Sequence, residues 1–279
     1  MSESANLEFI DTHAHLNDPQ FSTDREEVLA DANRSGVSTV VNVAFSESLW
    51  ASAIALNDRH RSVPYTLGIH PNNAEEWSQD AGARLVELAR SSLPVAIGET
   101  GLDYYWDRVP KTTQMASFDA QLSIAAQLDL PVIIHLRGDV EADLRQTIGG
   151  HPRVRCVFHS FDGSPELFAW IIERGWVVGV GGLISRRSAK SLREMLRTAP
   201  LEHIVLETDS PYLAPTGWSE KRNAPSAIPI IADHLARLRG DSLETVSSGT
   251  TSTARKAFAL DQIAPVLRTA AESSAEQTS

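Results

Sequence analysis

The feature of this 279-residue chain that most constrains its fold is a regular alternation of short apolar runs with longer helix-like stretches. The runs are rich in Val and Ile. They cover residues 7–13, 38–43, 64–70, 94–99, 131–135, 153–159, 175–182 and 203–209. Short β-branched runs that alternate with helices are typical of βα units and a parallel sheet. Eight such units suit a closed barrel of about 250 residues, so the sequence predicts an α/β fold made of a single (β/α)₈ TIM-type barrel.

An open, doubly wound sheet is the alternative that this alternation leaves. The first βα turn of such a sheet would carry a glycine-rich phosphate loop, but no GxGxxG or GxxxxGK(S/T) motif follows any of the runs. Two amphipathic segments after the last run, residues 226–240 and 242–258, are expected to complete the outer ring of helices. We therefore expect one barrel domain over residues 1–267 and a polar, flexible tail over residues 268–279.

Composition narrows the possible partners and the compartment. Cys156 is the single cysteine, so any metal must be held by histidines and carboxylates, and a reducing, cytoplasmic location is the default. No apolar run approaches the roughly 20 residues that span a bilayer, so no membrane association is expected. The net charge of −11 argues against a passive nucleic-acid coat, although an enzyme can concentrate cations at one mouth. Nothing in the sequence indicates an obligate protein partner, and a monomer is the default.

Residues of the types that bind metal ions recur where the predicted strands end. They are His13, His15, Glu99, His135, His159 and Asp209. The carboxyl ends of barrel strands converge on one face, so these groups are expected to surround one mouth. His13 and His15 are two residues apart in an extended strand and therefore face the same side.

Each of these residues taken alone could be a solvated strand end or a hydrogen-bonded core group. Six of them at one end of a barrel favour a metal site, because buried ionisable groups without partners are costly. Asp11 and Glu207 share strand parity with His13 and Asp209. They are candidates for orienting a ligating histidine, and a buried structural hydrogen bond explains them equally well.

Several longer motifs add a family resemblance to this argument. They are FIDTHAHL, TLGIHP, VAIGETGLDYYWD, LPVIIHLR, VFHSFDG, IVLETDSPYLAP and KRNAPSAI. The motifs run in order along nearly the whole chain, which resembles the TatD metal-dependent hydrolases among the amidohydrolase-like barrels. The resemblance implies that Glu99 bridges two divalent ions, with His13, His15 and Asp209 on one ion and His135 and His159 on the other. The chain departs from the family pattern after GIHP, where Asn72 and Asn73 replace the usual histidine.

A ligand set of imidazoles and carboxylates suits Zn²⁺, Mn²⁺, Co²⁺ or Fe²⁺, and Mg²⁺ is expected to bind weakly. Two such ions would lower the pKa of a bound water toward about 7. We therefore expect a metal-dependent deoxyribonuclease in which Glu99 and Asp209 are catalytic. Asp209 would ligate a metal and accept the proton of the water, or would serve as a ligand alone.

Candidate substrate-binding residues lie in the loops that follow the predicted strands. Arg137 follows His135 by two positions, and Lys221, Arg222 and Asn223 lie in the long loop after the last strand. The resemblance implies that His70 contacts a phosphate or a leaving group, although a hydrogen-bonded strand-end histidine is the simpler reading of its position. Tyr104 and its neighbours Tyr105 and Trp106 could stack on the bases of single-stranded DNA, but for Tyr105 and Trp106 loop packing is favoured.

Two other functions remain open at this stage. Similar two-metal barrels hydrolyse esters or amides, and the resemblance also admits a D-aminoacyl-tRNA deacylase. Such an enzyme would need an apolar pocket and fewer cations than a nuclease that acts on DNA ends or single strands. A binding protein without activity is least favoured, because the set of candidate ligands is intact.

Overall fold

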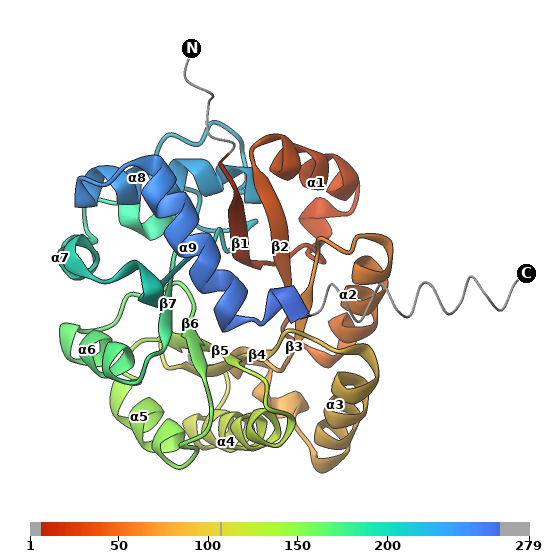
Figure 1. The fold of residues 1–279 in the computed structure, drawn as a ribbon. Coiled ribbons are helices and arrows are strands. Elements are labelled where there is room, and N and C mark those ends of the chain that lie inside the picture. Colours follow the sequence, from red (N-terminus) through yellow and green to blue (C-terminus); the bar gives the residue numbers. More distant parts are fainter. Residues whose placement is uncertain (1–6, 107, 263–279) are drawn as a thin grey trace, which may run out of the picture.

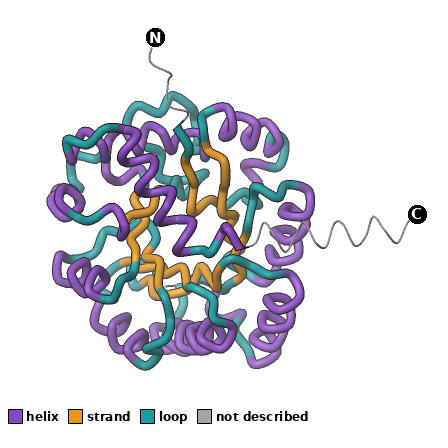
Figure 2. Tube along the Cα trace, viewed as in Figure 1, coloured by secondary structure: helices purple, strands orange, loops and turns teal. Residues whose placement is uncertain are grey.

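Eight parallel strands form one sheet in the order β1 to β8 in the computed structural model, which describes residues 7–106 and 108–262 (Figures 1 and 2). The strands are β1 (Phe9–Ala14), β2 (Val37–Ala44), β3 (Tyr65–Leu67), β4 (Ala96–Asp103), β5 (Val132–Arg137), β6 (Cys156–Phe158), β7 (Val177–Val180) and β8 (Ile204–Leu206). Each pairs in parallel with the next one in the chain. The predicted (β/α)₈ barrel is confirmed.

The sheet closes where the last strand meets the first. Ala14 and Ser210 form an isolated parallel bridge beyond the end of β8. Lower down, the hydroxyl of Thr12 donates a hydrogen bond of 3.0 Å to the carbonyl of Leu206. At the junction of β8 and β1, a side-chain hydrogen bond therefore supplements a single backbone bridge. The other neighbouring strands are joined by regular parallel pairing.

Helices surround the strands as an outer ring (Figure 1). They are α1 (Arg25–Arg34), α2 (Glu47–Arg59), α3 (Gln79–Ser92), α4 (Lys111–Leu128), α5 (Glu141–Gly149), α6 (Pro165–Glu173), α7 (Lys190–Thr198) and α8 (Ile228–Arg239). Short 3₁₀ turns occupy some of the connections. They are η1 (Pro19–Phe21), η2 (Pro71–Glu76), η3 (Gly182–Ser185), η4 (Leu201–His203) and η5 (Pro225–Ala227). A further helix, α9 (Leu243–Ala257), crosses one end of the barrel (Figure 1).

Local sequence signals fix where several helices begin and end. The hydroxyls of Ser78, Ser164 and Ser242 accept hydrogen bonds from the first turns of α3, α6 and α9, which satisfies backbone donors that a helix leaves unpaired. Gly240 ends α8 with a φ of 73°, a conformation that costs glycine little.

A cluster of buried apolar side chains fills the end of the barrel beneath α9. Ile10, Val43, Ile133 and Val205 belong to one buried cluster with Phe258, which directly follows α9. A second, larger cluster lies between the strands and the outer helices. The amino ends of the strands are thus filled by apolar side chains beneath α9, and the polar residues of the barrel interior lie toward the carboxyl ends.

The strand boundaries differ from prediction most clearly in β4. We expected this strand to end at Glu99, but it continues to Asp103, which pairs with Arg137 of β5. The glycines in this segment suggest a loop, yet Gly101 lies so close to β5 that a Cβ atom there would come within 2.1 Å of the His135 carbonyl oxygen. A residue without a side chain is therefore what allows the two strands to pair here.

Some predictions are not tested by the fold. The tail over residues 268–279 lies outside the described residues. Within residues 7–106 and 108–262, no helix is both long and apolar enough to cross a bilayer. The expected cytoplasmic location and monomeric state stay predictions.

Candidate metal centre

The side chains predicted to bind metal come together at the carboxyl end of the barrel. β1 and the residue after it supply His13 and His15, while β4 and β5 supply Glu99 and His135. The segments that follow β6 and β8 supply the other two, which are His159 and Asp209. Glu99 lies in the middle of its strand rather than at its end, because β4 is longer than predicted.

Glu99 lies at the centre of this cluster. Its Oε1 atom is 2.7 Å from Nε2 of His159 and 2.7 Å from Nδ1 of His135. Its Oε2 atom is 3.4 Å from Nε2 of His13 and 3.9 Å from Nε2 of His15. Each carboxylate oxygen thus faces a different pair of histidines, which is the arrangement expected of a bridging ligand.

Asp209 completes the group on the Oε2 side of Glu99. Its Oδ1 atom is 3.2 Å from Nε2 of His15 and 3.7 Å from Nε2 of His13, and these two nitrogens are 3.3 Å apart. The backbone N–H of Asp209 donates to the carbonyl of His13 at 2.8 Å, which ties the loop after β8 to β1. The Nδ1 atom of His15 is 3.3 Å from the carbonyl of Val43, to which it can donate a hydrogen bond when it carries a proton. In that tautomer Nε2 is unprotonated, and its lone pair points into the cluster.

Protonation favours the same interpretation. Burial, and then the neighbouring His159, lower the pKa of His13 to about 4, so its ring is neutral at pH 7. Burial raises the pKa of Glu99, but the surrounding histidines outweigh it and hold that pKa well below its usual value. The neutral ring of His13 beside the ionised Glu99 offers a lone pair and a negative charge to a divalent cation. Carboxylate neighbours outweigh burial and raise the pKa of His15 and His135, and a bound cation would displace the protons that these two rings hold.

His70 lies inside the cluster rather than at its rim. Its Nε2 atom is 3.6 Å from Oε1 of Glu99, and its ring centroid is 4.3 Å from that of His135. Its Nδ1 atom accepts a hydrogen bond of 3.0 Å from the backbone of Asn72. His70, Glu99 and His135 are close enough to share one ion, as are His13, His15 and Asp209. A ligand role for His70 therefore competes with the predicted phosphate contact.

Glu207 lies beneath His159 in the barrel interior, where the absence of a side chain on Gly179 leaves room for its carboxylate. Its Oε1 atom accepts a hydrogen bond from the backbone of Ser160 and lies 3.9 Å from Nδ1 of His159. A Cβ atom on Gly179 of β7 would come within 2.0 Å of its Oε2 atom. Burial, followed by the charge of Asp209, raises the pKa of Glu207 well above its usual value.

Asp11 forms the matching network beneath His13. Its carboxylate accepts hydrogen bonds from the backbone and hydroxyl of Thr208 at 3.0 and 2.6 Å, and from the backbone of His13 at 3.2 Å. Asp11 therefore joins the segment that carries His13 to the segment that carries Asp209. Burial raises its pKa to about 7, although the hydrogen bonds from Thr208 oppose that shift.

Asp103 is a contributor that the sequence did not reveal. Its Oδ2 atom lies 3.3 Å from Nε2 of His135 and accepts a hydrogen bond of 3.1 Å from the side chain of Asn72. Hydrogen bonds to Asp103 and Glu99 outweigh burial and raise the pKa of His135 to about 9. Asp103 could have been found from strand parity, because it lies four residues after Glu99 on the same face.

A cleft of about 450 Å³ opens beside the cluster. His135, His159 and Asp209 line it together with Arg137 and Arg186. Both arginines are exposed, and within residues 7–106 and 108–262 neither forms an ion pair. The cleft also has two acidic side chains, which are Glu141 and Asp162. The guanidinium groups of Arg137 and Arg186 make it a suitable receptor for a phosphate group.

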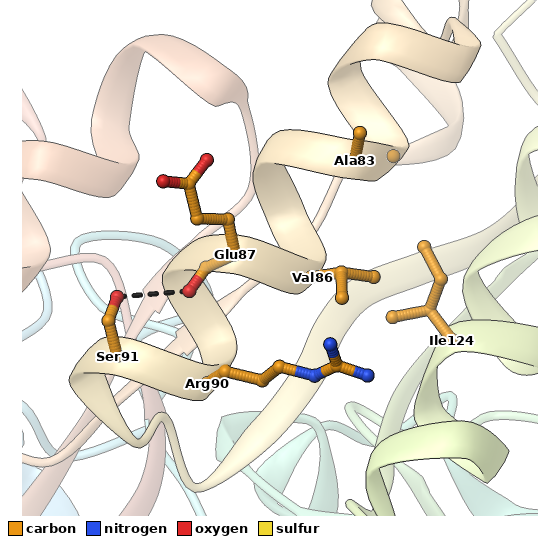
Figure 3. A pocket seen from close by; sticks show the side chains of 7 residues that line it. Ala83, Val86, Glu87, Arg90, Ser91 and Ile124 are labelled. Atoms are coloured by element: carbon orange, nitrogen blue, oxygen red, sulfur yellow. Dashed lines mark hydrogen bonds between the residues drawn. The ribbon is translucent and has the colours of Figure 1, made fainter.

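Another hollow, of about 660 Å³, lies on the outer surface between α3 and α4 (Figure 3). Ala83, Val86 and Ile124 give it an apolar lining, with Glu87 and Arg90 beside them. It is more voluminous than the cleft, but none of the candidate metal ligands lines it. Chemistry rather than volume therefore identifies the site.

Tyr104 and the cations after β8 are not among the residues that line the cleft. The Tyr104 hydroxyl donates to Asp143 at 2.8 Å, and Lys111 covers the Tyr104 ring. The guanidinium of Arg222 forms a 2.6 Å ion pair with Asp24. Lys221 lines a separate hollow together with Asp24. Intramolecular contacts thus engage Tyr104 and Arg222, and the substrate contacts expected of Tyr104, Lys221 and Arg222 stay predictions.

Asn223 is buried in the loop that follows β8. Its side-chain amide donates hydrogen bonds to the carbonyls of Thr208 and Tyr212 at 2.8 and 2.7 Å. These two carbonyls lie on either side of Asp209 in the chain. Asn223 therefore holds the loop that carries Asp209, whereas we expected it to contact substrate.

The fold and the site together define a class of protein, the metal-dependent hydrolases built on a (β/α)₈ barrel. Residues 10–259 match the family model described as TatD related DNase. The chain belongs to this family, which confirms the predicted membership and, at the level of the family, the predicted metal-dependent nuclease.

Individual relatives agree with this assignment. The chain is 34% identical over 254 residues to the "Uncharacterized metal-dependent hydrolase YabD" of Bacillus subtilis, covering 90% of this chain and 99% of the relative. It is 34% identical over 257 residues to the "3'-5' ssDNA/RNA exonuclease TatD" of Pantoea ananatis, with the same coverage. The crystal structure of the TatD homologue YJJV from Escherichia coli superposes with a TM-score of 0.85 at 30% identity, covering 91% of this chain and 98% of that chain.

Proposed function

We propose that this protein is a nuclease that hydrolyses phosphodiester bonds of single-stranded DNA with two divalent ions, of which Zn²⁺, Mn²⁺ and Co²⁺ suit the donors best. The observation that carries the proposal is the placement of Glu99, whose two oxygens face two separate pairs of histidines. Family membership and the exonuclease named among the relatives support the choice of substrate.

The six candidate ligands would be shared between the two ions. His13, His15 and Asp209 would hold one ion, His135 and His159 the other, and Glu99 both. When bound, such ions supply Lewis acidity that makes water a nucleophile and neutralises charge on the substrate.

The protein's own groups would then place the substrate and move the proton. Arg137 and Arg186 would bind the phosphate within the cleft. The oxygen of a water would form a bond to phosphorus while the bond from phosphorus to the leaving sugar oxygen breaks, and that oxygen would take up a proton from solvent water. Asp209 would accept the proton of that water.

The cleft favours this reaction over the hydrolysis of esters or amides. The two exposed arginines that line the cleft suit an anionic substrate, whereas a neutral ester would need a more apolar pocket. A deacylase acting on D-aminoacyl-tRNA remains the second candidate, because its substrate is also anionic.

The test compares the cleavage of 5′-labelled single-stranded DNA with that of the matching duplex. The protein is stripped with a chelator and reconstituted separately with Mg²⁺, Mn²⁺ or Zn²⁺. Glu99→Gln should abolish cleavage. Glu87→Gln is the matched control, because it makes the same change at an exposed site on α3 (Figure 3), in a hollow that none of the candidate ligands lines, and it should cleave normally. Cleavage by the Glu99→Gln protein, or by the metal-free protein, would contradict the proposal, and a lack of cleavage with every metal would favour the deacylase.

A further inference from the structure

Two neighbouring aromatic side chains at the end of β4 are exposed to solvent, contrary to the expected loop packing. Tyr105 is 60% exposed and Trp106 is 42% exposed. Their ring centroids are 4.9 Å apart with the planes nearly perpendicular. We call Tyr105 and Trp106 the aromatic pair. Large apolar rings left in water at one place are a common mark of a binding surface.

Arginines accompany the aromatic pair. The guanidinium carbon of Arg137 lies 4.4 Å from the ring centroid of Tyr105 and 5.7 Å from that of Trp106. Arg108 lies 5.1 Å from the Trp106 ring. Arg137 also lines the cleft beside His135, so the aromatic pair adjoins the site where the phosphate would bind. Aromatic faces interleaved with positive charges are the chemistry that recognises single-stranded nucleic acid.

One carboxylate holds the aromatic pair in a fixed position relative to the metal centre. The Oδ1 atom of Asp103 accepts hydrogen bonds from the backbones of Tyr105 and Trp106 at 3.0 and 3.2 Å. Its Oδ2 atom contacts His135. Gly138 keeps β5 close to this turn, because a Cβ atom there would come within 2.9 Å of the Tyr105 nitrogen. The turn is therefore built onto the site, which a ligand-binding surface needs and a simple loop does not.

We infer that the aromatic pair, with Arg137, binds the bases of a single-stranded nucleic acid whose backbone enters the cleft. This inference rests on the proposed function and deepens it. A base in a single strand offers a flat face to Tyr105 or Trp106, whereas a base in a duplex is already stacked between its neighbours. The aromatic pair thus selects single strands over duplexes.

The charge of the surroundings favours this occupant over an apolar peptide. The chain as a whole carries a net charge of −11, yet Arg108 lies beside the ring of Trp106 and Arg137 beside that of Tyr105, while both rings stay exposed. Arg108 and Arg137, together with Arg186 in the cleft, attract a polyanion. An apolar peptide would gain nothing from these charges.

The test measures binding of two labelled oligonucleotides of equal length and equal charge, one of thymidines and one of abasic sites. Both carry phosphorothioate linkages, which resist hydrolysis, and fluorescence anisotropy gives their affinities for the full-length, metal-reconstituted protein. We expect wild-type protein to prefer the thymidine strand. Trp106→Ala should weaken binding of that strand by roughly tenfold, as expected for the loss of one stacked base, and should leave binding of the abasic strand unchanged. Tyr105→Ala should act in the same direction.

Leu93→Ala is the matched control, because Leu93 is 51% exposed and directly follows α3, away from the cleft. It should bind both strands as the wild type does. Equal wild-type affinity for the two strands, or equal losses for both strands in Trp106→Ala, would overturn the inference. Failure of the proposed function gives a different result, namely that wild-type and Leu93→Ala proteins leave an unmodified strand uncut with every metal.

Discussion

Replacing Gly179 with alanine tests how the carboxylate beneath the metal centre is accommodated. Gly179 lies in β7, and a Cβ atom there would fall 2.0 Å from Oε2 and 2.5 Å from Cδ of Glu207. Glu207 is completely buried, so its carboxylate cannot move aside into solvent. We therefore expect Gly179→Ala to push Glu207 away from Ser160 and His159.

The size of the effect follows from opposing contributions to the free energy of unfolding. Alanine in place of glycine within a strand normally gains about 0.5 to 1 kcal/mol. Overpacking of a dense interior costs about 1 to 3 kcal/mol. The backbone N–H of Ser160 loses its acceptor, which costs about 1 to 3 kcal/mol more. We expect a net loss of about 3 kcal/mol.

Urea unfolding followed by circular dichroism measures this loss, with a chelator present so that bound metal adds no stability. Gly149→Ala is the matched control, because no atom lies within 4 Å of a Cβ placed at the end of α5. The decisive comparison repeats Gly179→Ala in a Glu207→Ala protein, where the obstructing carboxylate is gone. There the substitution should cost little. An equal cost in both backgrounds would refute the reasoning.

Three further predictions concern the metal, the pH and the loop after β8. Mn²⁺ at about 100 times its Kd should raise the free energy of unfolding by about 2.7 kcal/mol for each ion bound, and urea titration should show this gain largely lost in Glu99→Gln; an undiminished gain would remove Glu99 from the site. Burial raises the pKa of Asp11 to about 7, so the metal-free protein should lose stability as the pH rises from about 4 through 7, by up to about 1.4 kcal/mol per pH unit. Asp11→Asn should flatten that dependence of the urea midpoint, and an unchanged slope would contradict the assignment. Arg222→Glu should lower stability by about 1 kcal/mol by opposing Asp24 and should leave KM for DNA unchanged, and Asp24→Arg in the same protein should restore the midpoint; a raised KM at unchanged stability would return Arg222 to the substrate path.

The architecture and the principal ligands could be predicted because their signals are local. Each buried strand carries its own β-branched run, and His13, His135 and His159 lie within or directly after such runs. Barrel topology then brings the carboxyl ends of the strands together whatever the details of the loops. For this reason the six predicted ligands lie in one cluster although the boundaries of β4 were wrong.

The substrate contacts could not be predicted, because they depend on partners far away in the sequence. Arg222 pairs with Asp24, which lies 198 residues earlier in the chain. Tyr104 is anchored by Asp143 of α5, and its neighbour Tyr105 is exposed, the reverse of what we expected. Residue type alone does not tell which of two adjacent tyrosines finds a distant partner.

The closure of the barrel sets the order in which a newly made chain can become active. The hydroxyls of Ser247 and Thr251, on α9, donate hydrogen bonds to the carbonyl of Glu8, just before β1. His13 likewise contacts Asp209, which lies 196 positions later in the chain. Such contacts join a segment that leaves the ribosome early with one that leaves it late. They therefore form late, because closing so long a loop costs conformational entropy. A fragment that ends before Asp209 would lack this ligand of the cluster as well as the contacts that α9 makes with Glu8.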